Sequence, residues 1–104
     1  MKTFTEQEII DHLTGSGADE YSWYEDLYYD ESLSRICVAM ADGEGGTHWA
    51  SFTPEELEKI IFTIIAGDDA PAKQIARAVR HDDFDSDDAD IVLQIATLGT
   101  VVFG

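Results

Sequence analysis

The sequence is poor in cysteine and in basic residues, and each shortage excludes a class of protein. Cys37 is the only cysteine, so an intramolecular disulfide and a cysteine-based zinc finger are both impossible. It lies in the apolar run RICVAMA, a context that favours a buried structural thiol over a reactive one. Only six lysines and arginines accompany 22 aspartates and glutamates, which gives a formal net charge of −16.

This negative charge limits the partners that the protein can bind. A domain of 104 residues is roughly 30 Å wide, so the net charge amounts to about one per 2 Å of width. Duplex DNA carries one charge per ~1.7 Å of its axis. We therefore predict no direct binding to nucleic acid and none to anionic membranes, whereas imitation of DNA is physically possible.

Long hydrophobic runs are also missing. The longest apolar segments are too short to cross a bilayer, and the N-terminal MKTFTEQEII has no apolar signal core. A hydrophobic fraction of 44% is nevertheless ordinary for a folded chain, and the length fits one domain over residues 1–104. We expect a soluble protein located in the cytoplasm.

The first half of the chain predicts one helix and then a sheet. Thr5 followed by Glu8 forms a capping-box pattern, which predicts a helix over residues 5–14. Residues 20–52 show alternating polar and apolar positions, interrupted by the turn-rich DGEGG at 42–46. Short links favour a meander, so we predict three antiparallel strands.

The second half predicts helices alone. Thr53, Pro54 and Glu56 repeat the helix-start signals, and a helix that ends at Gly67 follows them. A shorter helix is expected from about Pro71, and a last helix over residues 87–98, with an extended finish at its end. The fold class is therefore α+β: a small three-stranded antiparallel sheet with an N-terminal helix and three C-terminal helices.

Residues 81–90 read HDDFDSDDAD and resemble the start of a calcium loop. Asp83, Asp85 and Asp87 occupy loop positions 1, 3 and 5. Position 6 requires glycine but is Asp88, and position 12 requires glutamate but is Gln94. The spacing therefore argues against a specific calcium site.

A helix start explains the same stretch better. Asp85 or Ser86 can cap the last helix, and Asp87 and Asp88 in its first turn are favoured by the helix dipole. A cap uses one or two acids, however, and this stretch has six. The excess is either a solvated acidic face or a surface that a partner recognises.

The stretch EYSWYEDLYYDE at 20–31 mixes five aromatic residues with five acids. Alternation along a strand places Tyr24, Asp26, Tyr28 and Asp30 on one face. Carboxylates beside phenol rings suit an arginine-rich surface, because arginine pairs with carboxylates and stacks on aromatic rings. The alternative is that these tyrosines only cover the sheet.

Signatures of catalysis are weak. The three histidines are distant in sequence and match no metal-binding helix pattern, and no nucleophile-elbow motif is present. We predict that the protein is not an enzyme and needs no cofactor or metal. Lys73, Arg77 and Arg80 share one side of a helix and are expected to bridge to the acidic segments, with a small anion site as the alternative.

The C-terminal DFDSDDADIVLQIATLGTVVFG resembles the ends of small acidic proteins encoded by phages and prophages of actinobacteria. Those proteins combine an Asp-rich lead, an apolar helix and a closing Val-Val-aromatic-Gly, as Val101, Val102, Phe103 and Gly104 do here. The resemblance covers about the last 25 residues best. It implies a phage context, in which proteins of this charge are similar in kind to DNA-mimicking inhibitors of restriction or CRISPR systems.

The leading hypothesis is a non-enzymatic interaction protein in the cytoplasm of a host cell. Its acidic surface would block a basic nucleic-acid-binding site of a CRISPR effector or restriction enzyme. Alternatives are an acidic domain adapted to high salt, or a small enzyme; a homodimer is also possible. The predicted partner-binding residues are Glu25, Asp26, Asp30, Glu31, Tyr24, Tyr28, Asp82, Asp83, Asp85, Asp87, Asp88 and Asp90.

Overall fold

The computed structural model describes residues 4–104 and begins with the predicted helix. Helix α1 spans Glu6–Thr14, and Thr5 and Glu8 form the expected capping box. A single 3-10 turn, η1, follows at Ala18–Glu20. The chain enters this turn through Gly17, whose φ of 95° is a left-handed value that glycine adopts without steric cost.

Three strands then form one antiparallel sheet in the order β1-β2-β3, as a meander. Strand β1 spans Tyr24–Asp30, β2 spans Arg35–Ala41 and β3 spans Thr47–Phe52. Residues 20–23, expected to begin the first strand, instead belong to η1 and a bend. Strand β1 also has a bulge between Tyr24 and Asp26. A bulge adds one residue and reverses which face the preceding side chain occupies.

The turn between β2 and β3 is closed by one aspartate. Asp42 Oδ1 accepts the backbone N–H groups of Glu44 at 2.7 Å and Gly46 at 3.1 Å, and these bonds lower the pKa of its carboxyl. Gly43 and Gly45 both have a positive φ, which explains why this link is rich in glycine.

Three helices complete the fold. Helix α2 spans Pro54–Ile65 and starts with the capping box of Thr53 and Glu56. Helix α3 spans Ala70–His81 with Asp69 as its N-cap, and α4 spans Ser86–Leu98. Residues 100–103, expected to finish extended, form no strand. The predicted α+β class, with one helix before the sheet and three after it, is confirmed.

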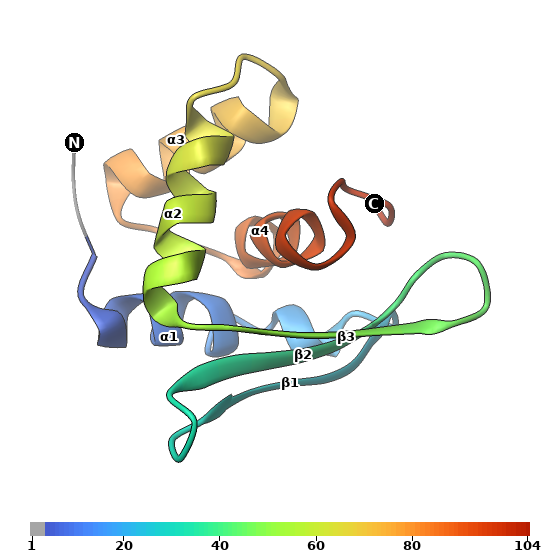
Figure 1. Ribbon diagram of the computed structural model, residues 1–104. Helices are drawn as coiled ribbons and strands as arrows, with labels where there is room; N and C mark the ends of the chain where they lie inside the picture. Colours follow the sequence, from blue (N-terminus) through green and yellow to red (C-terminus); the bar gives the residue numbers. More distant parts are fainter. Residues whose placement is uncertain (1–3) are drawn as a thin grey trace.

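All four helices lie on one side of the sheet (Figure 1). We call the covered side the inner face and the other side the outer face. Ile36, Val38 and Met40 of β2 point to the inner face and are buried there, as their alternation predicted. Leu27, Ile61 and Leu93 join them in the core from β1, α2 and α4.

The Cα extents of the molecule are 37 × 33 × 20 Å. Within residues 4–104, no helix combines the length and the apolar character that crossing a membrane would require.

Candidate functional site

The aspartate-rich segment first builds the start of α4. Asp85 is the N-cap: its Oδ1 accepts the Asp88 backbone N–H at 2.9 Å, and Asp88 Oδ2 accepts the Asp85 backbone N–H at 3.1 Å. Gln74 of α3 donates from Nε2 to Asp88 Oδ1 at 2.8 Å. Asp88 is only 6% exposed, and burial raises the pKa of its carboxyl. The cap predicted from sequence is therefore present, and Asp88 also binds α3.

Asp90 joins α4 to the beginning of the sheet. It is 6% exposed, and its Oδ1 accepts the Trp23 indole N–H and the Tyr24 hydroxyl, both at 2.8 Å. Its Oδ2 accepts from Gln94 Nε2 at 2.8 Å. Burial and the bond to Asp90 raise the pKa of Tyr24 far above its usual value. One turn earlier, Asp87 accepts a hydrogen bond from the Tyr21 hydroxyl.

Gln94 extends this network to the C-terminal segment. Its Oε1 accepts the backbone N–H groups of Val102 and Phe103, both at 2.8 Å, and its Nε2 donates to the Phe103 carbonyl at 3.0 Å. The held Phe103 ring stacks on Trp23 at 5.2 Å, and Trp23 stacks on Tyr21 at 4.7 Å. The aspartates and Gln94 of α4 thus fix a three-ring stack.

Three predicted partner-binding residues are buried. Asp88 and Asp90 are engaged inside the protein, and Tyr24 is 8% exposed because the bulge turns it toward the inner face. The expectation that these three side chains lie on a binding surface is therefore wrong. Asp82, Asp83, Asp85 and Asp87 of the same segment are exposed.

Asp82 has a structural position although it is exposed. Its left-handed φ of 53° ends α3, and its Oδ1 lies 3.4 Å from His12 Nε2 of α1. The His12 ring in turn stacks on Phe84 with a centroid distance of 4.9 Å. Of the six aspartates in this segment, only Asp83 has a side chain without a hydrogen bond or ion pair to residues 4–104.

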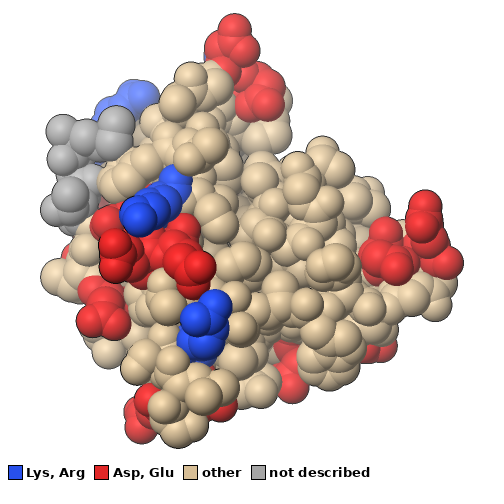
Figure 2. All heavy atoms as spheres, viewed as in Figure 1, with Lys and Arg blue, Asp and Glu red and all other residues tan. Residues whose placement is uncertain are grey.

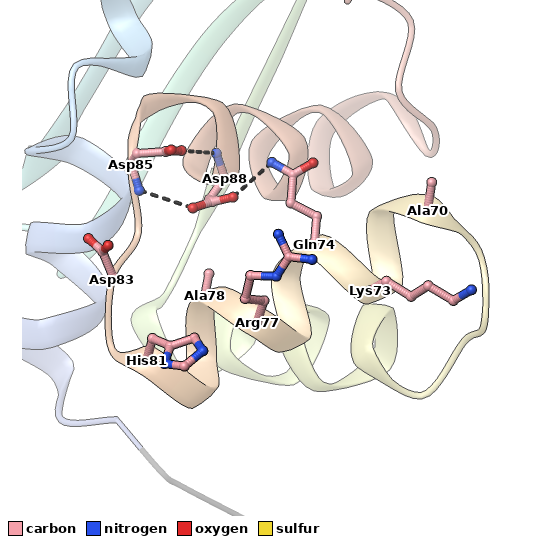
Figure 3. A pocket seen from close by; sticks show the side chains of 9 residues that line it. All are labelled: Ala70, Lys73, Gln74, Arg77, Ala78, His81, Asp83, Asp85 and Asp88. Atoms are coloured by element: carbon pink, nitrogen blue, oxygen red, sulfur yellow. Dashed lines mark hydrogen bonds between the residues drawn. The ribbon is translucent and has the colours of Figure 1, made fainter.

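A cleft of about 530 Å³ opens between α3 and the start of α4 (Figure 3). Lys73, Arg77 and His81 lie along α3 on one side of it, and Asp83, Asp85 and Asp88 lie on the other. Within residues 4–104, no ion pair joins Lys73, Arg77 or Arg80 to an acid, so the expected bridges are not formed. Opposite charges on facing walls suit a ligand that carries both signs.

The outer face of the sheet is the second candidate surface. Trp49 of β3 is 70% exposed and Tyr28 of β1 is 46% exposed. Asp26, Ala39 and Trp49 are register partners in one row across the sheet, and Tyr28, Cys37 and Ser51 are partners in the next. Cys37, expected to be buried, is half-buried because it points to this uncovered face.

Acids surround this outer face. Glu25 accepts a hydrogen bond from the Thr47 hydroxyl at 2.9 Å across the sheet. Asp30 closes the turn after β1 by accepting from the Ser32 hydroxyl at 2.6 Å and from two backbone N–H groups, which lower the pKa of its carboxyl. Glu31 is exposed in that turn. Asp26 and Tyr28 thus line one hollow of the outer face, whereas Glu25, Asp30 and Glu31 lie at other positions along β1 and its turn and Tyr24 points to the inner face.

The two predicted acidic regions do not form one surface. Strand alternation points Asp26 and Tyr28 away from the helices, whereas residues 82–90 lie in the helical layer (Figure 1). On the face shown in Figure 2, acidic side chains gather in separate groups beside α2, at the α2–α3 connection and at the β2–β3 turn, and basic side chains lie next to the group beside α2. The charge is thus divided into patches.

Trp49 is the residue of this surface that sequence reasoning missed. The signal was present in THWASF, because Ala50 and Phe52 pack toward the core and their neighbours must then face outward.

Among residues 4–104, no three histidine, cysteine, aspartate or glutamate side chains are grouped so that they could hold a metal ion. Comparisons with protein-family models, curated proteins and solved structures found no match for this chain. Its function is therefore argued from its own surfaces.

Proposed function

We propose that this protein is a non-enzymatic inhibitor that binds a basic, nucleic-acid-binding surface of another protein in place of DNA. In the phage context suggested by its C-terminal sequence, the target is a host defence complex in the cytoplasm, either a CRISPR effector or a restriction enzyme. The protein would act by occupying the site, with no chemical step.

The observation that carries this proposal is the large number of acidic side chains that are not paired with a lysine or arginine. Within residues 4–104, lysine or arginine pairs with an acid at Arg35 with Glu56 and at Lys59 with Glu55, and the His12 ring lies beside Asp82. The chain has 22 acids, so most carboxylates have only water and hydrogen-bond donors around them. Self-repulsion of this kind destabilises a folded protein, and a basic partner would relieve it.

The density of the charge also supports the proposal. A net charge of −16 over a longest extent of 37 Å corresponds to about one charge per 2.3 Å. Duplex DNA has one per ~1.7 Å, so the two linear charge densities are similar. A protein surface that neutralises DNA phosphates with lysine and arginine would therefore also attract this protein, over a similar distance.

The test is competition for a bound duplex. A fluorescently labelled DNA duplex is bound to a purified restriction endonuclease and, separately, to a CRISPR effector complex, and its anisotropy is followed as the protein is added. We expect displacement from at least one complex, with an affinity that falls steeply as NaCl increases, because the contacts are electrostatic.

Polyaspartate of the same total charge is the control for nonspecific displacement. The protein should displace the duplex at a concentration well below that of polyaspartate, because it presents its carboxylates on a rigid surface. Failure to displace DNA from any complex tested at low salt, or displacement no better than that by polyaspartate, would overturn the proposal.

A further inference from the structure

A shallow trough runs along the middle of the outer face. We call it the outer trough; its hollow has a volume of about 400 Å³. The half-buried Cys37 of β2 lies along its centre. Ala39, the next outward-facing residue of β2, is fully buried and does not line the hollow. Side chains of the two neighbouring strands flank it on both sides. They are Asp26 and Tyr28 on β1, and Trp49 and Ser51 on β3.

The register of the sheet sets the distance between the two walls. Asp26 and Trp49 are both partners of Ala39, one on each neighbouring strand. Adjacent strands lie about 4.8 Å apart, so the backbones of Asp26 and Trp49 are about 10 Å apart. A carboxylate and an indole ring therefore border the same narrow space, where one side chain of a partner can contact both.

Within residues 4–104, neither of these two groups is paired with a cation. Asp26 Oδ1 accepts only the backbone N–H of Leu27 at 3.0 Å, and no cation of residues 4–104 pairs with it. Arg35 also lies on the outer face and is held at the Ser51 end of the trough, away from Asp26 and Trp49. It donates to the Ser51 hydroxyl at 2.9 Å and carbonyl at 3.0 Å, and its Nη2 lies 3.3 Å from Glu56 Oε1.

We propose that the outer trough binds an arginine side chain of the partner protein, with its guanidinium stacked on Trp49 and paired with Asp26. This inference rests on the proposed function, since the partner's basic surface supplies the arginine. A planar guanidinium can stack on an aromatic ring and bond to a carboxylate at the same time, which an ammonium group does less well. A tryptophan ring is the strongest aromatic partner for a cation.

Charge complementarity decides between a basic partner and a second copy of this chain. Asp26 lines the trough, and Glu25, Asp30 and Glu31 lie on the same strand or in the turn after it. A second copy would therefore bring like charges together on a chain whose net charge is −16. An isologous dimer through this face would therefore be opposed by repulsion, and a cationic surface would be attracted.

The experiment uses two simple cationic probes, a hexa-arginine peptide and a hexa-lysine peptide. Each is titrated into the isotopically labelled protein while its amide and indole N–H signals are followed by NMR. We expect hexa-arginine to shift the Trp49 indole signal and the amides of Asp26 and Ala39 most. The Trp23 indole, which is bonded to Asp90, should change little and serves as an internal reference.

Matched variants separate the trough from general charge. Trp49→Ala should weaken hexa-arginine binding about fivefold, and Asp26→Asn about threefold. The controls are Leu33→Ala, which removes another exposed apolar side chain, and Glu44→Gln, which removes one charge at the β2–β3 turn. Both controls should stay within about twofold of the original protein.

Equal effects of Asp26→Asn and Glu44→Gln, or no preference for arginine over lysine, would overturn the arginine site. A dimer in sedimentation that protects Trp49 would overturn it as well. These outcomes are distinguishable from failure of the proposed function. If Trp49→Ala still displaces DNA, the proposed function stands and the arginine site does not. If hexa-arginine binds at Trp49 but the protein displaces no DNA, the arginine site stands and the proposed function does not.

Discussion

The Tyr24 hydroxyl donates a hydrogen bond to the Asp90 carboxylate at 2.8 Å, and this contact ties the first residue of β1 to α4. Both side chains are buried, and the Trp23 indole donates to the same oxygen. A buried carboxylate is tolerated when several donors surround it, and Asp90 has three. Asp90 therefore stabilises the fold, and it is not available to a partner.

Replacing Asp90 should destabilise the protein strongly. Asp90→Ala leaves the Tyr24 hydroxyl, the Trp23 indole and one Gln94 donor without an acceptor, and each buried unpaired group costs about 1–3 kcal/mol. We expect the free energy of unfolding, measured in urea, to fall by about 3 kcal/mol. Asp83→Asn removes a charge from the same segment without removing a side-chain hydrogen bond, so it should change the free energy of unfolding little. Similar losses in the two variants would contradict this account.

Gln94 should control the position of the C-terminal segment. Gln94→Ala removes both acceptor contacts to the backbone of Val102 and Phe103, so Phe103 should leave the Trp23 ring. We expect faster hydrogen exchange at the amides of residues 102 and 103 and a changed Trp23 fluorescence, with a loss of stability of about 2–4 kcal/mol. Thr100→Ala, at an exposed position next to this segment, is the control. Unchanged exchange at these two amides would show that Gln94 does not hold the segment.

Asp88 should make the stability of the protein depend on pH in an unusual direction. Burial raises the pKa of its carboxyl above the ordinary value of an aspartate, so the folded state holds this proton more tightly than the unfolded state does. The contribution of Asp88 is therefore fully present below the unfolded pKa and is lost as the pH rises through the folded pKa.

The measurement compares the original protein with Asp88→Asn, which does not titrate. From pH 4 upward, the free energy of unfolding of the original protein should fall relative to that of the variant, and the difference should then become constant. If the original protein instead became more stable relative to Asp88→Asn over this range, the folded-state pKa of Asp88 would have to be lowered.

Salt should stabilise the folded protein without being required for folding. The core and the Asp90 network contain few ion pairs that salt could weaken. The surface, in contrast, carries many carboxylates that are not paired with a cation, and salt screens the repulsion between them. Going from about 0.01 M to 1 M NaCl shortens the Debye length from about 30 Å to about 3 Å. We expect circular dichroism to show a folded protein in dilute buffer, with a melting temperature that rises with salt.

The double variant Asp68→Asn, Asp83→Asn is the matched comparison, because it removes two exposed charges. Its melting temperature should depend less on salt than that of the original protein. A protein that unfolds in dilute buffer would instead favour the alternative of a domain adapted to high salt.

Local signals made the architecture predictable from sequence. Thr5 with Glu8 and Thr53 with Glu56 each start a helix at the expected residue, because capping depends only on neighbours three positions apart. The meander followed from short links. The first strand began too early in the prediction, because the alternation of residues 20–23 resembles a strand although η1 and a bend occupy that region.

The candidate site was less predictable, because it depends on contacts between distant residues. The bulge before Asp26 reversed the face of Tyr24, and no local pattern announces a bulge. Asp90 was expected to be exposed because it stands among acids, yet its three donors come from Trp23, Tyr24 and Gln94. Burial of a polar residue is set by the partners that the fold supplies, and these lie up to 67 positions away.

That separation has a consequence for how the chain folds. The β1–β2 and β2–β3 pairings close short loops, whereas the bond between Trp23 and Asp90 closes one that spans most of the chain. Closing the longer loop costs more entropy before any contact offsets it, so we predict that the meander forms in the transition state ahead of the docking of α4. Substitutions at Asp90 should then accelerate unfolding much more than they slow folding, and the lifetime of the native state would be set by one carboxylate and the three donors around it.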